Sequence, residues 1–229
     1  DGDRVTHIVE KPEKGTEPSN LKVYCWLLSK KYVTVLEETP PEHYSFETAL
    51  ETFFKDHEVR YYKHRREFSL KYPWHLFDIQ KYLFEQSKSF THPTAVVAPT
   101  AIIDDSAGPV IIDEGAKINH AAKVVGPIYI GKNVLIGDFC FVRVGSIEAG
   151  CTIGSYTEVV RSIIMPHSEM HFGYIADSIV GTTVKIGAGF LTANKRHDRQ
   201  NILVTVKEKK VDIGRNNLGV MIGDRTKVG

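Results

Sequence analysis

The sequence has few cysteines and no excess of one charge, and each absence excludes a class of protein. Its cysteines are Cys25, Cys140 and Cys151, an odd number without a Cys-x-x-Cys pair, which argues against a disulfide framework and against a zinc site. Lys and Arg number 29 against 28 Asp and Glu, a formal net charge of +1, so no overall field attracts a nucleic-acid backbone. Nucleic acid is therefore not an expected partner, and we expect no metal site.

Long apolar runs are also absent. No stretch approaches the roughly 20 apolar residues of a membrane-spanning helix, and the opening Asp1-Gly-Asp-Arg4 does not resemble a signal peptide. We therefore expect a cytoplasmic protein that has no membrane partner. The chain opens directly into a strand-like segment at residues 4–9 and stops inside a repeat at residues 222–229, so we expect that both ends are cuts.

The first part of the chain alternates strand and helix signals. Short apolar segments at residues 5–9, 21–28 and 59–62 predict strands, and residues 41–56 carry one apolar face with helical spacing. Pro73 stands at the first turn of a further predicted helix, which we expect to pack on the same sheet. We expect a partial α/β domain of Rossmann-like type over residues 1–90, with a companion half that is missing or supplied by a partner.

From about residue 94 the apolar pattern changes to a period of six. Aliphatic residues, with one Thr, recur at this spacing with a few interruptions: Ile112, Ile118, Val124, Ile130, Ile136, Val142, Ile147, Ile153, Val159, Val180, Ile186, Thr192, Ile222 and Val228. Four positions later there is often a smaller residue: Ala116, Ala122, Val134, Cys140, Cys151, Thr157, Val184 and Thr226. A half-buried strand would alternate every second residue and a helix every 3.6 residues.

A period of six fits a three-sided coil in which each flat side contributes one inward aliphatic and one small corner residue. The sequence therefore predicts a left-handed parallel β-helix of hexapeptide repeats over residues 91–229, an exception to the usual right-handed crossover. In this register Cys140 and Cys151 point inward, so we interpret them as packing residues and not as nucleophiles.

Motifs in the first part resemble sugar-1-phosphate nucleotidyltransferases. Ile8-Val-Glu-Lys-Pro12 is similar to the Glu-Lys-Pro segment of that family, Ser19-Asn-Leu-Lys-Val-Tyr24 to its Asn-x-Gly-x-Tyr strand and Tyr72-Pro-Trp-His-Leu76 to its Pro-Trp-Asp-Leu helix. The resemblance implies that Glu10 and Asn20 bind the sugar and that Lys11 meets the phosphate. A carboxylate accepts hydrogen bonds from sugar hydroxyls, and an ammonium group is a point charge for phosphate. The alternative for Glu10 and Lys11 is a solvated strand end.

Motifs in the second part are similar to the acetyltransferase site of bifunctional N-acetylglucosamine-1-phosphate uridyltransferases, closest to the archaeal type. The matching segments are Ser168–Asp177, Lys185–Asn194, Thr192–Asp198 and Val211–Gly219. The resemblance implies acetyl-CoA as co-substrate, a homotrimer with shared sites, and a sugar phosphate or nucleotide sugar as ligand. No residues are assigned to cofactor binding.

The resemblance also implies roles for single residues in this half. His171 would take a proton from the amino group of an amino-sugar 1-phosphate, Tyr174 and Asn194 would hold that substrate, and Arg143 would meet its phosphate. Imidazole titrates near neutrality and a guanidinium fork suits phosphate. The alternative for His171 is an ordinary polar residue on a coil surface. For the basic loop around His197, a solvated surface is the favoured interpretation over a cofactor-phosphate clamp.

Departures from the family leave two hypotheses open. The Gly-rich nucleotide loop is absent, His43 replaces the glutamate of a Gly-Glu-Tyr segment, and Ser69 stands where a magnesium-binding aspartate is expected. Mg²⁺ prefers anionic oxygen ligands, so it is expected only if the missing nucleotidyltransferase half is present. Lys185 and Val160 also differ from the expected asparagine and lysine. The resemblance therefore implies one of two functions: an acetyltransferase of nucleotide-sugar biosynthesis, or a non-catalytic regulatory or scaffold subunit that binds sugar nucleotides.

Overall fold

The computed structural model describes residues 3–13, 15–16, 21, 23, 25–63 and 70–229. Contacts divide the chain into a first unit, Asp1–Ser69, and a second unit, Leu70–Gly229, which we describe separately. Within the described residues, every helix is too short or too polar to span a bilayer.

The first unit packs two helices around an aromatic core. Helices α1 (Lys30–Glu38) and α2 (Ser45–Asp56) contribute its buried side chains, which are Tyr32, Ala49, Leu50, Phe53 and Phe54. Strand β1 (Arg4–Val5) pairs antiparallel with β2 (Val59–Arg60). The helix expected within residues 41–56 is confirmed. Helix α1 was not expected; the edge of its Tyr32 ring packs against Phe53, with ring centroids 5.7 Å apart.

The strand expected over residues 21–28 is wrong for the part of that segment that the structure describes. Leu21, Val23 and residues 25–28 form no strand there, and Leu27 is 99% exposed. The described sheet of this unit contains β1 and β2. A third strand needs a ladder partner for its backbone groups, and apolar composition alone does not supply one.

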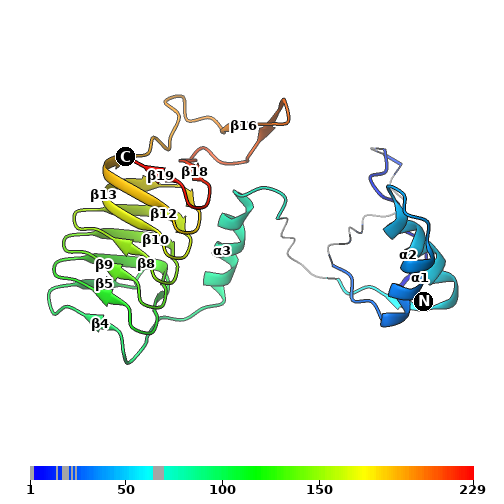
Figure 1. Ribbon diagram of the computed structural model, residues 1–229, viewed down its shortest axis with the longest axis horizontal. Coiled ribbons are helices and arrows are strands. Elements are labelled where there is room, and N and C mark those ends of the chain that lie inside the picture. Colours follow the sequence, from blue (N-terminus) through cyan, green and yellow to red (C-terminus); the bar gives the residue numbers. More distant parts are fainter. Residues whose placement is uncertain (1–2, 14, 17–20, 22, 24, 64–69) are drawn as a thin grey trace. The chain divides into compact units, whose positions relative to one another are not determined.

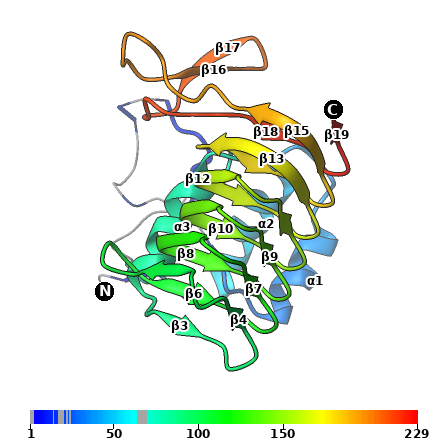
Figure 2. The same cartoon turned by 90° about the vertical axis from the view of Figure 1, so that its left-hand side faces the viewer.

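The second unit begins with helix α3 (His75–Glu85), which lies alongside the coils in both ribbon views (Figures 1 and 2). The sequence placed this helix on the α/β sheet and the domain boundary at residue 90, whereas the contacts place the division after Ser69. The physical reason is side-chain pairing within the second unit. Arg215 pairs with Asp78 and lies over the Phe77 ring, 5.4 Å from its centroid.

The remainder of the second unit is a parallel β-solenoid with three faces, visible as stacked coils in Figure 2. Face A consists of β4 (Val96–Val97), β7 (Lys117–Ile118), β9 (Leu135–Ile136), β11 (Thr152–Ile153), the starts of β13 (Glu169–Ala176) and β15 (Lys185–Leu191), and β19 (Lys227–Val228). Face B consists of β5 (Ile102–Asp104), the starts of β8 (Lys123–Ile130), β10 (Phe141–Ile147) and β12 (Glu158–Ile164), and the ends of β13 and β15. Face C consists of β3 (Phe90–Thr91), β6 (Val110–Ile112), the ends of β8, β10 and β12, β14 (Ile179–Val180) and β18 (Met221–Ile222).

The period-six residues form the core of this solenoid, which confirms the predicted repeat. From Ile112 to Thr192 every one of them is buried, at 0–8% exposure, and Ile222 and Val228 are half-buried. The pattern works because each coil stacks its inward aliphatic on the equivalent residue of the next coil, as Ile118 does on Ile136 and Ile136 on Ile153.

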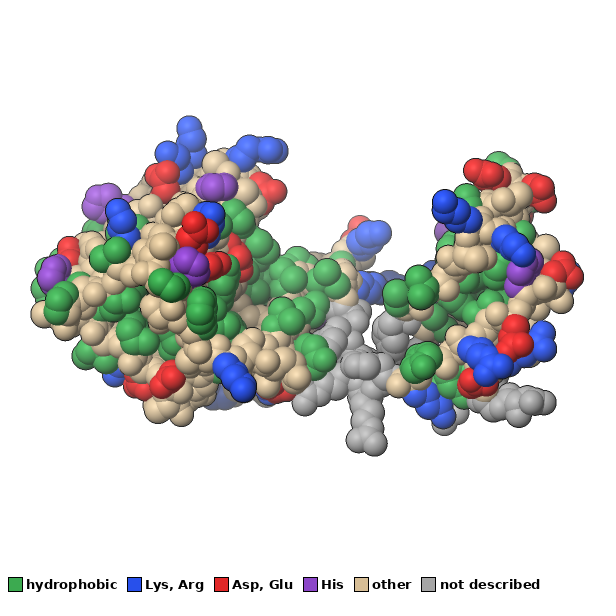
Figure 3. Space-filling model, turned by 90° about the horizontal axis from the view of Figure 1, so that it is seen from below, with side chains coloured by type: hydrophobic (Ala, Val, Ile, Leu, Met, Phe, Trp, Pro, Cys, Tyr) green, Lys and Arg blue, Asp and Glu red, His purple; other side chains and the backbone are tan. Residues whose placement is uncertain are grey.

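One excursion leaves the solenoid between Thr192 and Gly219. It carries a hairpin of β16 (Leu203–Val206) and β17 (Lys209–Asp212), with Ile213 buried beneath it. An antiparallel bridge between Lys195 and Asn217 closes its base. The face of the second unit that is shown in Figure 3 mixes apolar and charged side chains.

Two of the cysteines occupy small inward positions, as the sequence predicts. Cys140 and Cys151 are 1% and 0% exposed, whereas Cys25 is exposed. Burial raises the pKa of the Cys140 thiol and raises that of Cys151 to about 11, so neither forms appreciable thiolate near neutrality.

We expect a thiol reagent at pH 8 to modify Cys25 rapidly and to modify Cys140 and Cys151 only after denaturation. Mass spectrometry of peptides after timed alkylation measures this directly. Modification of Cys151 in the folded protein at the rate of Cys25 would show that the coil interior opens.

Candidate functional site

A large cavity of the second unit lies along face A and the corner where face A turns into face B. Its volume is about 940 Å³, within the range of small-molecule sites. Coils β11, β13, β15 and β19 contribute the lining, which includes Thr152, Gly154, Ser155, Tyr156, Glu169, His171, Phe172, Lys185 and Lys227. We refer to this cavity as the His171 pocket.

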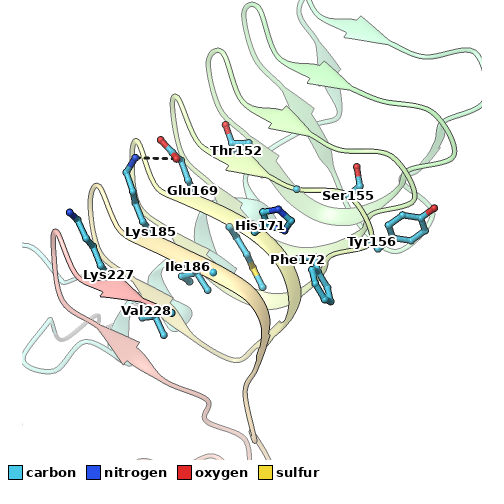
Figure 4. A pocket seen from close by; sticks show the side chains of 14 residues that line it. Thr152, Ser155, Tyr156, Glu169, His171, Phe172, Lys185, Ile186, Lys227 and Val228 are labelled. Carbon is cyan, nitrogen blue, oxygen red and sulfur yellow. Dashed lines mark ion pairs between the residues drawn. The ribbon is translucent and has the colours of Figure 1, made fainter.

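His171 lies near the middle of the pocket because β13 bends there. Met170 points into the core, 4% exposed, and the register between β13 and β15 shifts between Phe172 and Gly173 as the chain turns the corner. His171 itself is exposed, and its ring makes no hydrogen bond to the described residues. Figure 4 shows the imidazole between the lysines of face A and the aromatic side chains of the corner. The ring is therefore free to exchange a proton with a ligand.

Gly154, which follows β11 in the preceding coil, allows β13 to pass close to that coil at His171. Its N–H donates to the Met170 carbonyl at 2.8 Å, and a Cβ on this residue would lie 1.8 Å from the His171 carbonyl oxygen. The absence of a side chain thus allows two neighbouring coils to approach at the position that carries the histidine.

Positive charge gathers on the face A side of the pocket. Lys185 pairs with Glu169 at 3.3 Å, and both side chains are more than half exposed. Lys227 has no ion pair within the described part of the chain. Such a pair of ammonium groups suits a phosphate-bearing ligand that enters along face A.

The opposite side of the pocket carries aromatic residues that the sequence analysis missed. Tyr156 is 69% exposed, and its ring stacks on that of Phe139 with centroids 5.0 Å apart and an interplanar angle of 8°. A signal was present, since both residues directly precede small inward residues, Cys140 and Thr157. Periodicity places such residues on a corner but does not indicate that the corner borders a pocket.

Of the other predicted site residues in the solenoid, Arg143 is engaged elsewhere. It lies on face B outside the His171 pocket, donates to Glu158 at 3.0 Å and stacks on the Phe141 ring at 5.0 Å. Its Nε is buried without a hydrogen-bond partner in the described structure. The guanidinium is thus held rigidly against the face.

Tyr174 and Asn194 also lie outside the pocket. Tyr174 is half-buried on face B, where it is flanked by Glu158 and Leu191 in the neighbouring coils. The Asn194 amide donates to Asp177 Oδ2 at 2.6 Å. Within this chain the structure does not bring these residues together with His171.

Asp177 anchors the excursion to the solenoid. Its carboxylate, 9% exposed, accepts two hydrogen bonds from Arg161, at 2.6 and 2.8 Å, in addition to the one from Asn194. The Gly219 N–H donates to the Asp177 carbonyl at 2.8 Å. Asp177 therefore holds both ends of the excursion.

Replacing Asp177 by Ala should destabilise the second unit by about 2–3 kcal/mol, below the usual cost for a fully buried pair because Arg161 is 38% exposed. It should also release the excursion, so proteolysis near residues 195–216 should accelerate more than global unfolding does. Urea denaturation and limited proteolysis measure the two effects. Asp198→Ala, which removes an exposed pair with Arg196, serves as a control and should change neither by much.

A second cavity of about 390 Å³ lies where α3 meets the solenoid. Its lining includes Phe77, Phe84, Val144, Arg161 and Asp177. The Arg161–Asp177 ion pair, which anchors the excursion, thus also borders the contact between α3 and the solenoid.

Two of the predicted site residues of the first unit, Glu10 and Lys11, form an ion pair with each other. The Lys11 ammonium lies 3.0 Å from Glu10, and this contact raises the pKa of Lys11; both side chains are exposed. Asn20 and Ser69 lie outside the described residues. His43 contacts the Tyr44 ring.

Metal-ligand clusters are not found among the described residues. In the basic loop around His197, the side chains of His197 and Arg199 are exposed and Arg196 pairs with Asp198. The interpretation of this loop as a solvated surface stays a prediction.

The chain has relatives along almost its whole length. A bifunctional sugar-1-phosphate nucleotidylyltransferase/acetyltransferase of Sulfurisphaera tokodaii is 31% identical over 98% of this chain. A bifunctional protein GlmU of Methanocaldococcus jannaschii is 30% identical over 99% of it. The chain is related to these bifunctional nucleotidylyltransferase/acetyltransferases. It spans 56% of the length of each of these two relatives.

Other comparisons cover a little more than half of the chain. An uncharacterized acetyltransferase, YaiX, of Escherichia coli O6:K15:H31 is 39% identical over 58% of this chain and 59% of its own length. The solved acetyltransferase domain of PglB from Neisseria gonorrhoeae is 15% identical, covering 51% of this chain and 63% of that one, with a TM-score of 0.43. No protein-family profile matches the chain.

Proposed function

We propose that the second unit transfers the acetyl group of acetyl-CoA to the amino group of an amino-sugar 1-phosphate. The observation that carries this proposal is the free imidazole of His171 in a pocket that also holds Lys185 and Lys227. The kinship with bifunctional nucleotidylyltransferase/acetyltransferases supports it. We further propose that the solenoid winds left-handed, as hexapeptide repeats imply.

In the proposed reaction His171 acts as general base. The neutral amine nitrogen attacks the thioester carbonyl, a C–N bond forms, and His171 takes one proton from that nitrogen. The C–S bond then breaks, and the imidazolium returns the proton to the leaving thiolate. The products are the N-acetyl sugar phosphate and CoA with a free thiol. An imidazole without protein hydrogen bonds is suited to this proton shuttle.

The lysines of face A account for cofactor binding in this proposal. Lys185 and Lys227 would meet the phosphates of acetyl-CoA, while the thioester reaches His171. Because these side chains are exposed, their attraction should weaken with added salt, and KM for acetyl-CoA should rise with ionic strength.

We propose that the solenoid forms a homotrimer and that face B of one copy completes the His171 pocket of the next. This arrangement would give Arg143, Tyr174 and Asn194 their substrate-binding roles, although they lie outside the pocket within one chain. We propose a nucleotidyltransferase-like origin for residues 1–90, in which Glu10, Lys11 and Asn20 bind a sugar phosphate.

The test is to incubate the protein with acetyl-CoA and glucosamine 1-phosphate and to detect the N-acetyl product by mass spectrometry, which avoids background from Cys25. Product formation that depends on both substrates supports the proposal. Absence of product in a chain extended to the full length of its relatives would overturn it.

Non-catalytic sugar-nucleotide binding is the remaining alternative, favoured by Ser69 and His43 in place of the family's residues. Calorimetry separates the two: binding of a sugar nucleotide without any binding of acetyl-CoA would point to the regulatory role.

A further inference from the structure

The corner between faces A and B carries a column of exposed aromatic rings. Phe139 and Tyr156 occupy equivalent corner positions in successive coils, with φ angles of 57° and 61°. They are 55% and 69% exposed. Phe172 follows in the next coil at 43% exposure.

The corner geometry itself does not require aromatic residues. At the corner between faces C and A, the same left-handed backbone is occupied by Asn133, His167, Thr183 and Arg225. One coil below Phe139, the position belongs to Ala121, with φ of 55°. Small and polar residues thus serve the turn equally well, so the rings at 139 and 156 have no role in forming the coil.

Packing does not explain the rings either. The core beside them is filled by the inward residues Cys140 and Thr157, each 1% exposed. The parallel stack of Phe139 and Tyr156 orients the phenol ring and covers one of its faces. Within the described residues, no ring contact joins Tyr156 to Phe172. The Phe172 ring contacts that of His171, with ring centroids 6.1 Å apart. The second face of Tyr156 is therefore open, and the residue lines the His171 pocket.

The pocket has a basic side and an aromatic side, which suit the cofactor and the acceptor respectively. Figure 4 shows Lys185 and Lys227 on one side, Tyr156 and Phe172 on the other, and His171 between them. Anionic groups of the cofactor suit the lysine side. The acceptor must then approach His171 from the aromatic side, and a volume of about 940 Å³ leaves room for more than a monosaccharide phosphate.

We propose that the open face of Tyr156, supported by Phe139, stacks a nucleobase, so that the preferred acceptor is an amino sugar linked to a nucleoside diphosphate. This inference rests on the proposed acetyl transfer and extends its acceptor from the amino-sugar 1-phosphate to the nucleotide-linked amino sugar. An aromatic plane is the usual protein partner of a base, because every base presents a π face whatever its hydrogen-bonding edge.

Equilibrium binding tests the platform without any turnover. UDP and GDP, each compared with inorganic pyrophosphate by calorimetry, should bind at least about 10-fold tighter than pyrophosphate to the wild-type chain. Tyr156→Ala should weaken UDP binding by roughly 5- to 150-fold, the effect of removing one base-stacking contact. It should leave pyrophosphate affinity within about 2-fold. Phe90→Ala, which removes an aromatic ring of 52% exposure outside the pocket, is the matched control and should change neither.

Kinetics and hydrodynamics complete the test. Tyr156→Ala should raise KM for a UDP-linked amino sugar far more than KM for the amino-sugar 1-phosphate.

Equal affinity for UDP and pyrophosphate, or displacement of UDP by CoA in strict competition, would overturn the proposal. So would a smaller sedimenting species for Tyr156→Ala, because it would assign the rings to contacts between copies. If glucosamine 1-phosphate is acetylated while UDP fails to bind, the nucleobase platform is wrong and the proposed function stands. If UDP binds through Tyr156 without any acetyl transfer, the platform stands, and the proposed function and the assigned acceptor are wrong.

Discussion

The variant His171→Asn should lower kcat for acetyl transfer by roughly 10²- to 10⁴-fold, the usual contribution of a positioned general base. Asparagine keeps the exposed position and a polar side chain but has no group that accepts and returns a proton at neutral pH. KM for acetyl-CoA should change little, because the proposed cofactor contacts come from Lys185 and Lys227. Steady-state kinetics with mass-spectrometric detection of product gives both parameters.

His167→Asn is the matched control for this variant. His167 is also exposed on a solenoid corner, but on the corner between faces C and A and outside the His171 pocket. Its φ is 61°, a conformation that asparagine adopts readily. The control should keep the wild-type kcat. Equal kcat values for wild type and His171→Asn would remove His171 from the mechanism.

A methyl group at position 154 should be the most damaging small change to the solenoid. In Gly154→Ala the new Cβ would lie 1.8 Å from the carbonyl oxygen of His171 and 2.8 Å from the carbonyl oxygen of Met170. Both contacts are backbone, so no side chain can move aside, and the two coils must separate where Gly154 N–H meets the Met170 carbonyl. We expect a loss of about 3 kcal/mol or more in the free energy of unfolding, measured by urea denaturation.

Gly223→Ala tests whether this loss comes from the coil contact and not from glycine replacement in general. Gly223 follows the period-six residue Ile222 as Gly154 follows Ile153, yet a Cβ there meets no atom within 4 Å. The free energy of unfolding should stay within about 0.5 kcal/mol of wild type. A similar loss in both variants would mean that the spacing between coils is not the cause.

Sequence analysis located the solenoid because its repeat is local and regular. Each of Ile118, Ile136 and Ile153 is buried for the same reason, the stacking of equivalent positions, so one rule identifies the whole core. The first unit has no such repetition. Residues 21–28 are as apolar as a strand requires, but strand formation depends on a partner that composition does not reveal.

The candidate site was only partly accessible to the same reasoning. The resemblance pointed to His171, and the structure places it in a cavity of about 940 Å³ in the second unit. Tyr156 is 15 positions earlier in the sequence and became relevant only when the coils brought it beside the pocket. The roles of Arg143, Tyr174 and Asn194 stay predictions, because their chemistry depends on which surface lies opposite face B.

By itself, the sequence determined the parallel solenoid and the inward placement of Cys140 and Cys151, because both follow from the spacing of residues along the chain. The kinship with bifunctional nucleotidylyltransferase/acetyltransferases followed from motifs that resemble that family. Only the tertiary structure decided that α3 packs on the solenoid, that Asp177 anchors the excursion, and that Tyr156 shares a pocket with His171 and Lys227. These features arise from contacts between residues far apart in the chain, whose energies depend on distance in space and leave no period in the sequence.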